Sequence, residues 1–366
     1  MAETLSSRIF VNSEQVGDYV DIVMPATDKK TEEEIRIHYL EAGIGEPLLL
    51  IHGIGQSLYT WRCLFSELSE SYRVIAVDLP GHGYSGRPEQ FCYSMDEMAE
   101  ALKLFMDAKG IFSAHIMAFS TGSIYMMRLL KLYPQYVANC IAISPGGITK
   151  QMPSVFHNMK SAISAVFSRN LYTAGDVRKW LLECVYDKTN IDDRVVEQYY
   201  TPIEDGLTRE NLMYAVRNFD LKYVTDEMKD VDHEILLLWG REDKWHTPNS
   251  SIFFQGILQN GRYFLVRNAG HLVQEDTPDK LLQVIVSYIP PTVMPHYNGQ
   301  LFYTDLDLGK NRPEDDGNAI EEQMPGDVSL TEEAVETEEA PEEVAEPEET
   351  KEEVPAETVP EEEDKA

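Results

Sequence analysis

The sequence predicts an α/β fold, a mostly parallel sheet with helices on both faces. Short, continuous apolar runs that end at or near glycine recur along the chain, and such runs are typical of strands buried on both faces. Helical patterns separate these runs, and this alternation favours a parallel sheet. The chain has 366 residues, of which 43% are hydrophobic, so it has enough apolar material for a large core.

The expected strands follow one another in a regular order. Two segments within 18–44, DYVDIVMPA and EIRIHYLEAG, come first, and the second alternates apolar and polar residues as a half-buried strand does. Buried runs then recur as PLLLIHG (47–53), RVIAVDLPGHG (73–83), SAHIMAFSTG (113–122), NCIAISPGG (139–147) and EILLLWG (234–240).

Helices are predicted between these strands. The segment 95–110 places Met98, Leu102 and Phe105 on one stripe and ends at Gly110, which suits a helix C-cap. Further helices are expected at 121–134, which stops at a proline, and at 278–291, which is bounded by prolines at both ends.

One long segment interrupts the alternation of strands and helices. Residues 149–230 are helix-like and rich in methionine and aromatic residues, and they lie between two core strands. We therefore expect an inserted helical cap at 149–230 over a core formed by 1–148 and 231–312. Its aromatic and methionine residues include Met152, Phe156, Phe167, Trp180, Tyr199, Tyr200, Met213, Tyr214 and Phe219.

The acidity of the chain is concentrated in its last segment. Residues 313–366 hold 23 acidic residues and two lysines, a net charge of −21 out of −32 for the whole chain. A Pro- and Glu-rich segment with so few aromatic residues cannot bury enough surface to fold, so we expect a disordered tail. It could serve as a solubilising segment, an entropic spacer or a docking segment for an unknown partner.

Composition also bounds where the protein acts. No basic patch indicates nucleic-acid binding, and no run reaches the roughly 20 apolar residues that span a bilayer. The first residues lack the cationic stretch and apolar run of a signal peptide. The four cysteines form neither a CxxC pair nor a disulfide pattern. We expect a soluble, cytoplasmic protein with no stable membrane insertion.

The strongest chemical signal is Ser120 in the pentapeptide AFSTG. A buried strand leads directly into this serine and a helix follows, which would project the hydroxyl above the sheet at the positive end of the helix. A serine nucleophile at such a strand-to-helix turn usually lies in the pattern G-x-S-x-G, and here Ala118 stands in place of the first glycine. On the pentapeptide alone, an ordinary helix N-cap serine is an equally good interpretation.

A serine nucleophile needs a general base and an orienting acid. His271 follows the last core strand, and Asp243 follows the strand that ends at Gly240. Both lie after strand C-termini, where open α/β sheets place their sites, although the neighbouring Glu242 competes for the role of the acid. The backbone N–H groups of Ile54 and Thr121 are the expected oxyanion donors. No histidine spacing indicates a metal site, and no cofactor is expected.

Together these motifs resemble the α/β-hydrolase superfamily, in its capped, epoxide-hydrolase-like branch. The resemblance implies the α/β-hydrolase fold, a mostly parallel eight-stranded sheet with helices on both faces and an inserted helical cap. The resemblance runs from about residue 18 to 290 and implies Ser120 as the nucleophile, Asp243 as the acid, His271 as the base, and Ile54 and Thr121 as the oxyanion donors. The segments that carry it are LLLIHGIG, VIAVDLPGHGYSGRP, MAFSTGS, ISPGGI, LLWGREDKW and NAGHLVQEDTP.

The identity of the nucleophile narrows the reaction. Epoxide hydrolases and haloalkane dehalogenases of the branch it resembles use an aspartate, and an alkyl–serine ether could not be hydrolysed in the second step. We therefore expect a serine hydrolase of small, largely apolar esters or related acyl compounds, including thioester, amide or carbon–carbon bond hydrolysis. An acyltransferase, a cofactor-free haloperoxidase and a ligand receptor with vestigial hydrolysis stay open as alternatives.

Overall fold

The computed structural model describes residues 17–27, 29–147, 173–204 and 206–292. All of them belong to one compact unit, Met1–Ala319. The prediction of a disordered tail at 313–366 and the first part of the expected cap, 149–172, lie outside the described residues. Within the described part of the chain, no helix is both long enough and apolar enough to cross a bilayer.

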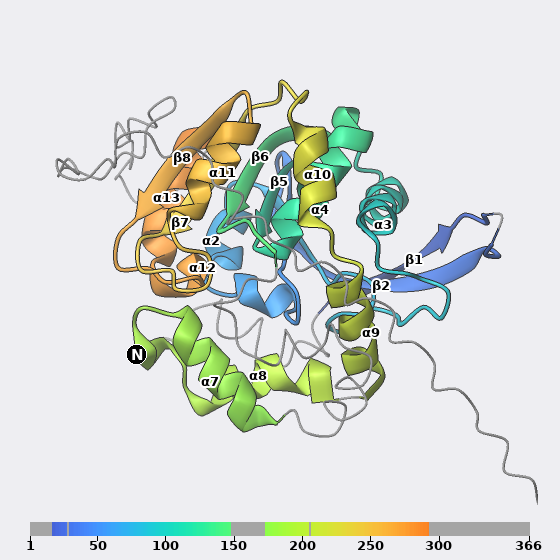
Figure 1. Cartoon of the computed structure of the whole chain (residues 1–366), viewed down its shortest axis with the longest axis horizontal. Helices are drawn as coiled ribbons and strands as arrows, with labels where there is room; N and C mark the ends of the chain where they lie inside the picture. The colour runs from blue at the N-terminus through green and yellow to red at the C-terminus, as the bar shows by residue number, and fades with distance from the viewer. Residues whose placement is uncertain (1–16, 28, 148–172, 205, 293–366) are drawn as a thin grey trace, which may run out of the picture. The chain divides into compact units, whose positions relative to one another are not determined.

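An eight-stranded sheet forms the centre of the fold, as predicted (Figure 1). Its strand order is β1-β2-β4-β3-β5-β6-β7-β8. The pairs β1–β2 and β2–β4 are antiparallel, and all the other neighbouring strands are parallel. The strands are β1 (Asp18–Met24), β2 (Glu33–Ala42), β3 (Pro47–Ile51), β4 (Arg73–Val77), β5 (Ala114–Phe119), β6 (Val137–Ile143), β7 (Ile235–Gly240) and β8 (Gly261–Val266).

The central strands are buried on both faces. Every residue of β5 and β7 is buried, which explains why their sequences are continuous apolar runs. The outer strand β1 instead alternates between exposed and buried residues over its second half. Since parallel strands end at the same edge of a sheet, the loops that follow β3, β5, β7 and β8 converge on that edge.

Helices connect the strands of the core. The predicted helix at 95–110 is α3 (Met95–Ala108), with its apolar stripe buried and Gly110 just beyond it at a φ of +65°. The predicted helices at 121–134 and 278–291 are α4 (Thr121–Leu132) and α13 (Pro278–Tyr288). The other core elements are the short helices η2 (Leu58–Trp61) and η3 (Pro134–Tyr136), and α2 (Phe65–Ser69), α11 (Ser250–Ile257) and α12 (Val273–Asp276).

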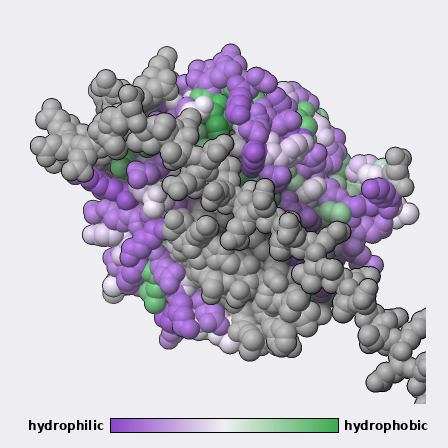
Figure 2. Space-filling model, in the orientation of Figure 1, coloured by the Kyte–Doolittle hydropathy of each residue, from purple (hydrophilic) through white to green (hydrophobic). Residues whose placement is uncertain are grey.

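A helical insertion lies between β6 and β7. Its described helices are α7 (Ala174–Cys184), η4 (Lys188–Asn190), α8 (Asp193–Glu204), α9 (Gly206–Arg217) and α10 (Leu221–Met228). Thr173 starts α7 with a capping box, because its hydroxyl accepts from the backbone of Asp176 while the Asp176 carboxylate accepts from the backbone of Thr173. In Figure 1, α7 and α8 lie together, and the described surface in Figure 2 is mostly hydrophilic. The borders of a separate cap domain remain a prediction.

Candidate active site

Ser120 sits at a sharp turn between β5 and α4. Its φ of +52° and ψ of −124° are rare for a residue with a side chain, and such strain clusters at functional positions. The turn is crowded, because a Cβ added at Gly122 would lie 2.3 Å from the carbonyl oxygen of His52. The Ser120 amide donates to the Ile143 carbonyl oxygen at 2.8 Å, which fixes the turn against β6. The strained turn therefore holds the serine hydroxyl at the sheet edge.

The three predicted triad residues lie together. The Nε2 atom of His271 is 3.2 Å from the Ser120 hydroxyl, and its Nδ1 atom is 2.8 Å from the Asp243 carboxylate. All three side chains are buried. The structure thus brings together residues that are 28 and 151 positions apart in sequence, in the geometry of a nucleophile, a base and an orienting acid.

Asp243 is held in place by its own loop. Its second carboxylate oxygen accepts hydrogen bonds from the backbone N–H groups of Trp245 and His246 at 2.8 and 2.9 Å. Burial alone would raise the pKa of Asp243, but the contact with His271 and the hydrogen bond from the His246 N–H outweigh it, so the pKa lies below its ordinary value. Asp243 is consequently ionised at neutral pH.

Glu242, the competing acid in the sequence, is engaged elsewhere. Its carboxylate accepts from the backbone N–H of Ala269 at 3.0 Å, and its own N–H donates to the carbonyl of the same residue at 2.9 Å. These contacts join the loop after β7 to the loop that carries His271. The geometry therefore gives Asp243, and not Glu242, the contact with the imidazole.

One of the two predicted oxyanion donors, the N–H of Ile54, is bonded to the side chain of Thr121. The N–H of Ile54 donates to the Thr121 hydroxyl at 2.8 Å, and both residues are buried. A hydroxyl oxygen therefore occupies the place next to the Ile54 N–H, the position that the predicted oxyanion role would give to a substrate oxygen.

Two buried histidines near the site bond to the backbone. His52 contacts the Gly53 carbonyl through Nδ1 at 2.7 Å and accepts from the Leu79 N–H at 3.0 Å. His82 contacts the Pro80 carbonyl at 3.0 Å. Burial lowers the pKa of His52, and it lowers that of His82 to about 3. Both rings are thus uncharged at neutral pH and support the loops below the serine.

Aromatic rings surround the imidazole of His271. The ring centroids of Phe119, Trp245 and His246 lie 4.9, 5.4 and 4.8 Å from that of His271. Trp245 and His246 were not singled out as site residues from the sequence, although they stand two and three positions after Asp243. His246 also contacts the Gly147 carbonyl through Nε2 at 2.7 Å. These rings restrict the movement of the His271 imidazole.

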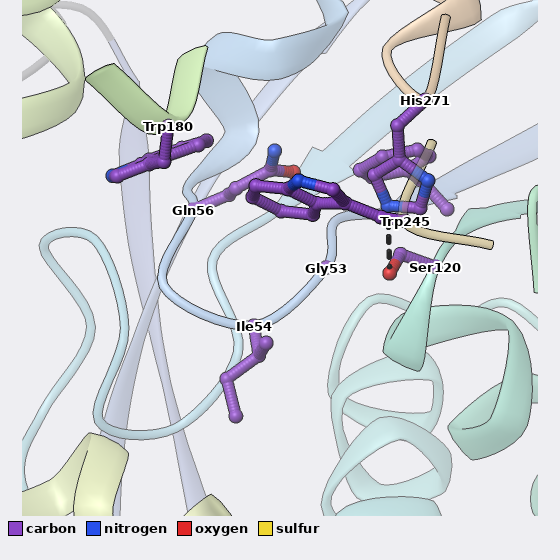
Figure 3. A pocket seen from close by; sticks show the side chains of 8 residues that line it. Gly53, Ile54, Gln56, Ser120, Trp180, Trp245 and His271 are labelled. Atoms are coloured by element: carbon purple, nitrogen blue, oxygen red, sulfur yellow. Dashed lines mark hydrogen bonds between the residues drawn. The ribbon is translucent and has the colours of Figure 1, made fainter. Parts of the chain in front are cut away.

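A small cavity opens over the serine (Figure 3). Its volume is about 10 Å³, room for roughly one water molecule. The helical insertion contributes Trp180 to it, and Gln56 contributes a buried side-chain oxygen that has no hydrogen-bond partner in the described part of the chain. The lining residues are Gly53, Ile54, Gln56, Phe119, Ser120, Trp180, Trp245 and His271.

The cavity lining is largely apolar. Of the insertion residues that the sequence singled out, Met152, Phe156 and Phe167 lie outside the described residues, and Tyr199 instead packs against Trp180 with ring centroids 5.8 Å apart. No group of three or more acidic, histidine or cysteine side chains within the described ranges could hold a metal ion.

The fold and site place this chain in a known family. A family model described as the alpha/beta hydrolase fold matches residues 46–278, so the chain belongs to the α/β-hydrolase family and is a hydrolase. Family membership leaves its reaction unspecified.

Individual relatives are distant. The chain is 24% identical over 275 residues to 2-hydroxy-6-oxo-6-phenylhexa-2,4-dienoate hydrolase of Comamonas testosteroni, with 71% of this chain and 93% of the relative covered. A meta-cleavage product hydrolase of Pseudomonas fluorescens IP01 superposes with a TM-score of 0.59 at 24% identity, covering 69% of this chain and 94% of the other. An esterase of Thermogutta terrifontis gives 0.61 at 21% identity, covering 74% and 97%. These structures share the fold.

Proposed function

We propose that the protein is a serine hydrolase of small, largely apolar esters or related acyl compounds. The observation that carries this proposal is the contact between the Ser120 hydroxyl and His271 Nε2 at 3.2 Å, with Asp243 on the other side of the ring. His271 takes the proton of Ser120 as its oxygen attacks the substrate carbonyl. The protonated imidazole then delivers that proton to the leaving group, which departs as an alcohol.

The second half of the reaction uses the same groups. His271 takes a proton from a water molecule, the hydroxide attacks the acyl-serine ester, and Ser120 recovers its proton as the acid is released. Asp243 stays ionised throughout and stabilises the imidazolium. An acyl ester of serine is a competent intermediate for this sequence, whereas an alkyl ether would not be hydrolysed.

The lining of the cavity supports an apolar, uncharged substrate. Phe119, Trp180 and Trp245 supply aromatic surface, and among the described lining residues there is no lysine or arginine to pair with a substrate carboxylate. Gln56 offers a polar contact for one neutral group of the substrate. We therefore propose a preference for apolar, uncharged substrates. We also propose that the protein is cytoplasmic and that its cap spans residues 149–230.

Carbon–carbon bond hydrolysis is the second candidate. The Pseudomonas structure is a meta-cleavage product hydrolase, and the Comamonas relative is named as the hydrolase of a dienoate, which is a carboxylate. The lack of a cationic side chain among the described lining residues favours the neutral ester over this substrate class. Three alternatives stay open because they would keep the same Ser120, His271 and Asp243. They are an acyltransferase, a cofactor-free haloperoxidase and a ligand receptor with vestigial hydrolysis.

Turnover of p-nitrophenyl esters tests the proposal. The wild-type protein is expected to hydrolyse p-nitrophenyl acetate and butyrate, and Ser120→Ala should lower kcat by about 10³-fold or more. Equal turnover by wild type and Ser120→Ala would contradict the assignment of the nucleophile. Measurement with and without a primary alcohol acceptor, with product analysis, separates hydrolysis from acyl transfer.

A further inference from the structure

Asp276 joins the loop that carries His271 to the helical insertion. It is the last residue of α12 and is half-buried. Its carboxylate accepts hydrogen bonds from one group in its own loop and from three groups in the segment after α7. The donors are the backbone N–H groups of Gly270 (2.8 Å), Tyr186 (2.8 Å) and Asp187 (3.0 Å), and the side-chain amide of Asn190 (3.3 Å).

The backbones of the two segments are also in direct contact on both sides of His271. The N–H of Leu272 donates to the Cys184 carbonyl at 3.0 Å. At Gly270, an added Cβ would lie 2.4 Å from the same carbonyl oxygen, so only glycine fits at this position. The end of α7 therefore packs against the backbone that immediately precedes and follows the base.

Glu275, the neighbour of Asp276, provides a second link to the insertion. Its buried carboxylate accepts from the Tyr199 hydroxyl of α8 at 2.7 Å and forms a two-pronged ion pair with Arg62. The Tyr199 hydroxyl is also 3.1 Å from the Thr60 hydroxyl of η2. Two consecutive acidic residues thus connect the insertion to the core beside the base.

We propose that Asp276 is a positioning residue that couples the docking of the insertion to the placement of His271. This inference rests on the proposed function, in which His271 is the general base. Asp276 binds the N–H of Gly270, the residue before the base, with the same oxygen that binds Tyr186 of the insertion. Loss of this carboxylate would leave backbone donors without their acceptor and loosen the attachment of the His271 loop to the insertion.

The direct experiment compares Asp276→Ala and Asp276→Asn with the wild type on p-nitrophenyl butyrate. Active sites are titrated with a fluorophosphonate, so that kcat is expressed per reactive Ser120. Because a displacement of about 1 Å in a catalytic group costs about 10²-fold, Asp276→Ala should lower kcat by that order with a smaller change in KM. Asp276→Asn keeps one acceptor oxygen and should lose about tenfold.

Asp279 offers the matched control. It is an exposed acidic residue three positions further along, in the first turn of α13, and Asp279→Ala should leave kcat, KM and Tm close to wild type. The pH profile of kcat/KM gives an independent readout. A displaced imidazole should shift its acidic limb in Asp276→Ala, and a purely structural loss would leave that profile unchanged.

A double-mutant cycle tests the link to the insertion. Asn190→Ala removes one contact to Asp276 from the insertion side, and the double variant with Asp276→Asn should be no slower than the slower single variant. If the kcat losses of the two single variants multiply in the double variant, the two residues act independently, which would contradict the coupling. So would a full kcat per titrated site in both Asp276 variants. A wild type that neither reacts with fluorophosphonate nor hydrolyses the ester would instead contradict the proposed function, and with it the positioning role of Asp276 that rests on it.

Discussion

The N–H of Ile54 donates to the hydroxyl of Thr121 across a distance of 2.8 Å, at the position where the proposed mechanism needs an oxyanion donor. Thr121 directly follows the nucleophile and is fully buried at the start of α4. An N–H group makes one strong hydrogen bond, so the substrate oxygen must displace this hydroxyl to use the Ile54 donor.

The first prediction concerns this exchange. Thr121→Ala removes the competing hydroxyl, and because a net hydrogen bond is worth about 1 kcal/mol, a trifluoromethyl ketone inhibitor should bind about fivefold more tightly. Thr121→Ser keeps the hydroxyl and should bind the inhibitor as the wild type does. Inhibition constants of the ketone for the wild type, Thr121→Ala and Thr121→Ser test this prediction. Binding that is tenfold weaker in Thr121→Ala would show that the hydroxyl itself donates to the oxyanion.

A second prediction concerns the acid. Asp243→Asn should lower kcat by about 10⁴-fold while the fold survives, because the amide cannot hold the required imidazole tautomer. Glu242→Gln is the matched control, since Glu242 bonds to the Ala269 backbone and not to the ring. Steady-state kinetics and circular dichroism of both variants provide the comparison. A damaging Glu242→Gln beside a neutral Asp243→Asn would reverse the assignment.

The third prediction is about acyl chain length. Trp180 lines the cavity over Ser120 from the insertion side and limits the room beside the serine. Trp180→Ala should move the optimum to longer p-nitrophenyl esters, with about 0.8 kcal/mol, or roughly fourfold, gained for each additional CH₂ buried. Tyr214→Ala, an exposed aromatic on α9, is the control. A flat profile from acetate to decanoate in both wild type and Trp180→Ala would contradict an apolar acyl pocket.

The fourth prediction follows from buried, uncharged histidines. Burial lowers the pKa of His82 to about 3, so the unfolded chain binds more protons than the folded protein as the pH falls from about 6.5 towards 3. The contribution of His82 to stability therefore decreases over this range, by up to about 1.4 kcal/mol per pH unit. Urea unfolding at pH 7, 6 and 5 measures the slope. His82→Gln should make the pH dependence of the unfolding free energy shallower. An unchanged slope would show that His82 does not contribute to this pH dependence.

The sequence was most informative where local patterns repeat. The buried runs predicted the strands, and the motifs around Ser120, Asp243 and His271 predicted residues that the structure places in contact. The catalytic roles of these residues stay predictions until they are tested. The prediction of these three residues rested on their order along the chain and on their positions after the ends of strands.

Other features of the site depend on contacts that no local pattern encodes. The bond from Ile54 to Thr121 joins residues 67 positions apart, and that from Tyr186 to Asp276 spans 90. Such contacts arise from the packing of the insertion on the loops of the core. Sequence periodicity indicates which face of an element is buried but not which partner it meets.

Covalent labelling tests the central claim most directly. The intact wild-type protein is incubated with a fluorophosphonate, digested, and analysed by mass spectrometry to locate the adduct. The proposed mechanism predicts a single modified residue, Ser120, with reaction abolished in Ser120→Ala and strongly slowed in Asp243→Asn. An adduct on another serine that persists in Ser120→Ala, or no adduct at all, would contradict it.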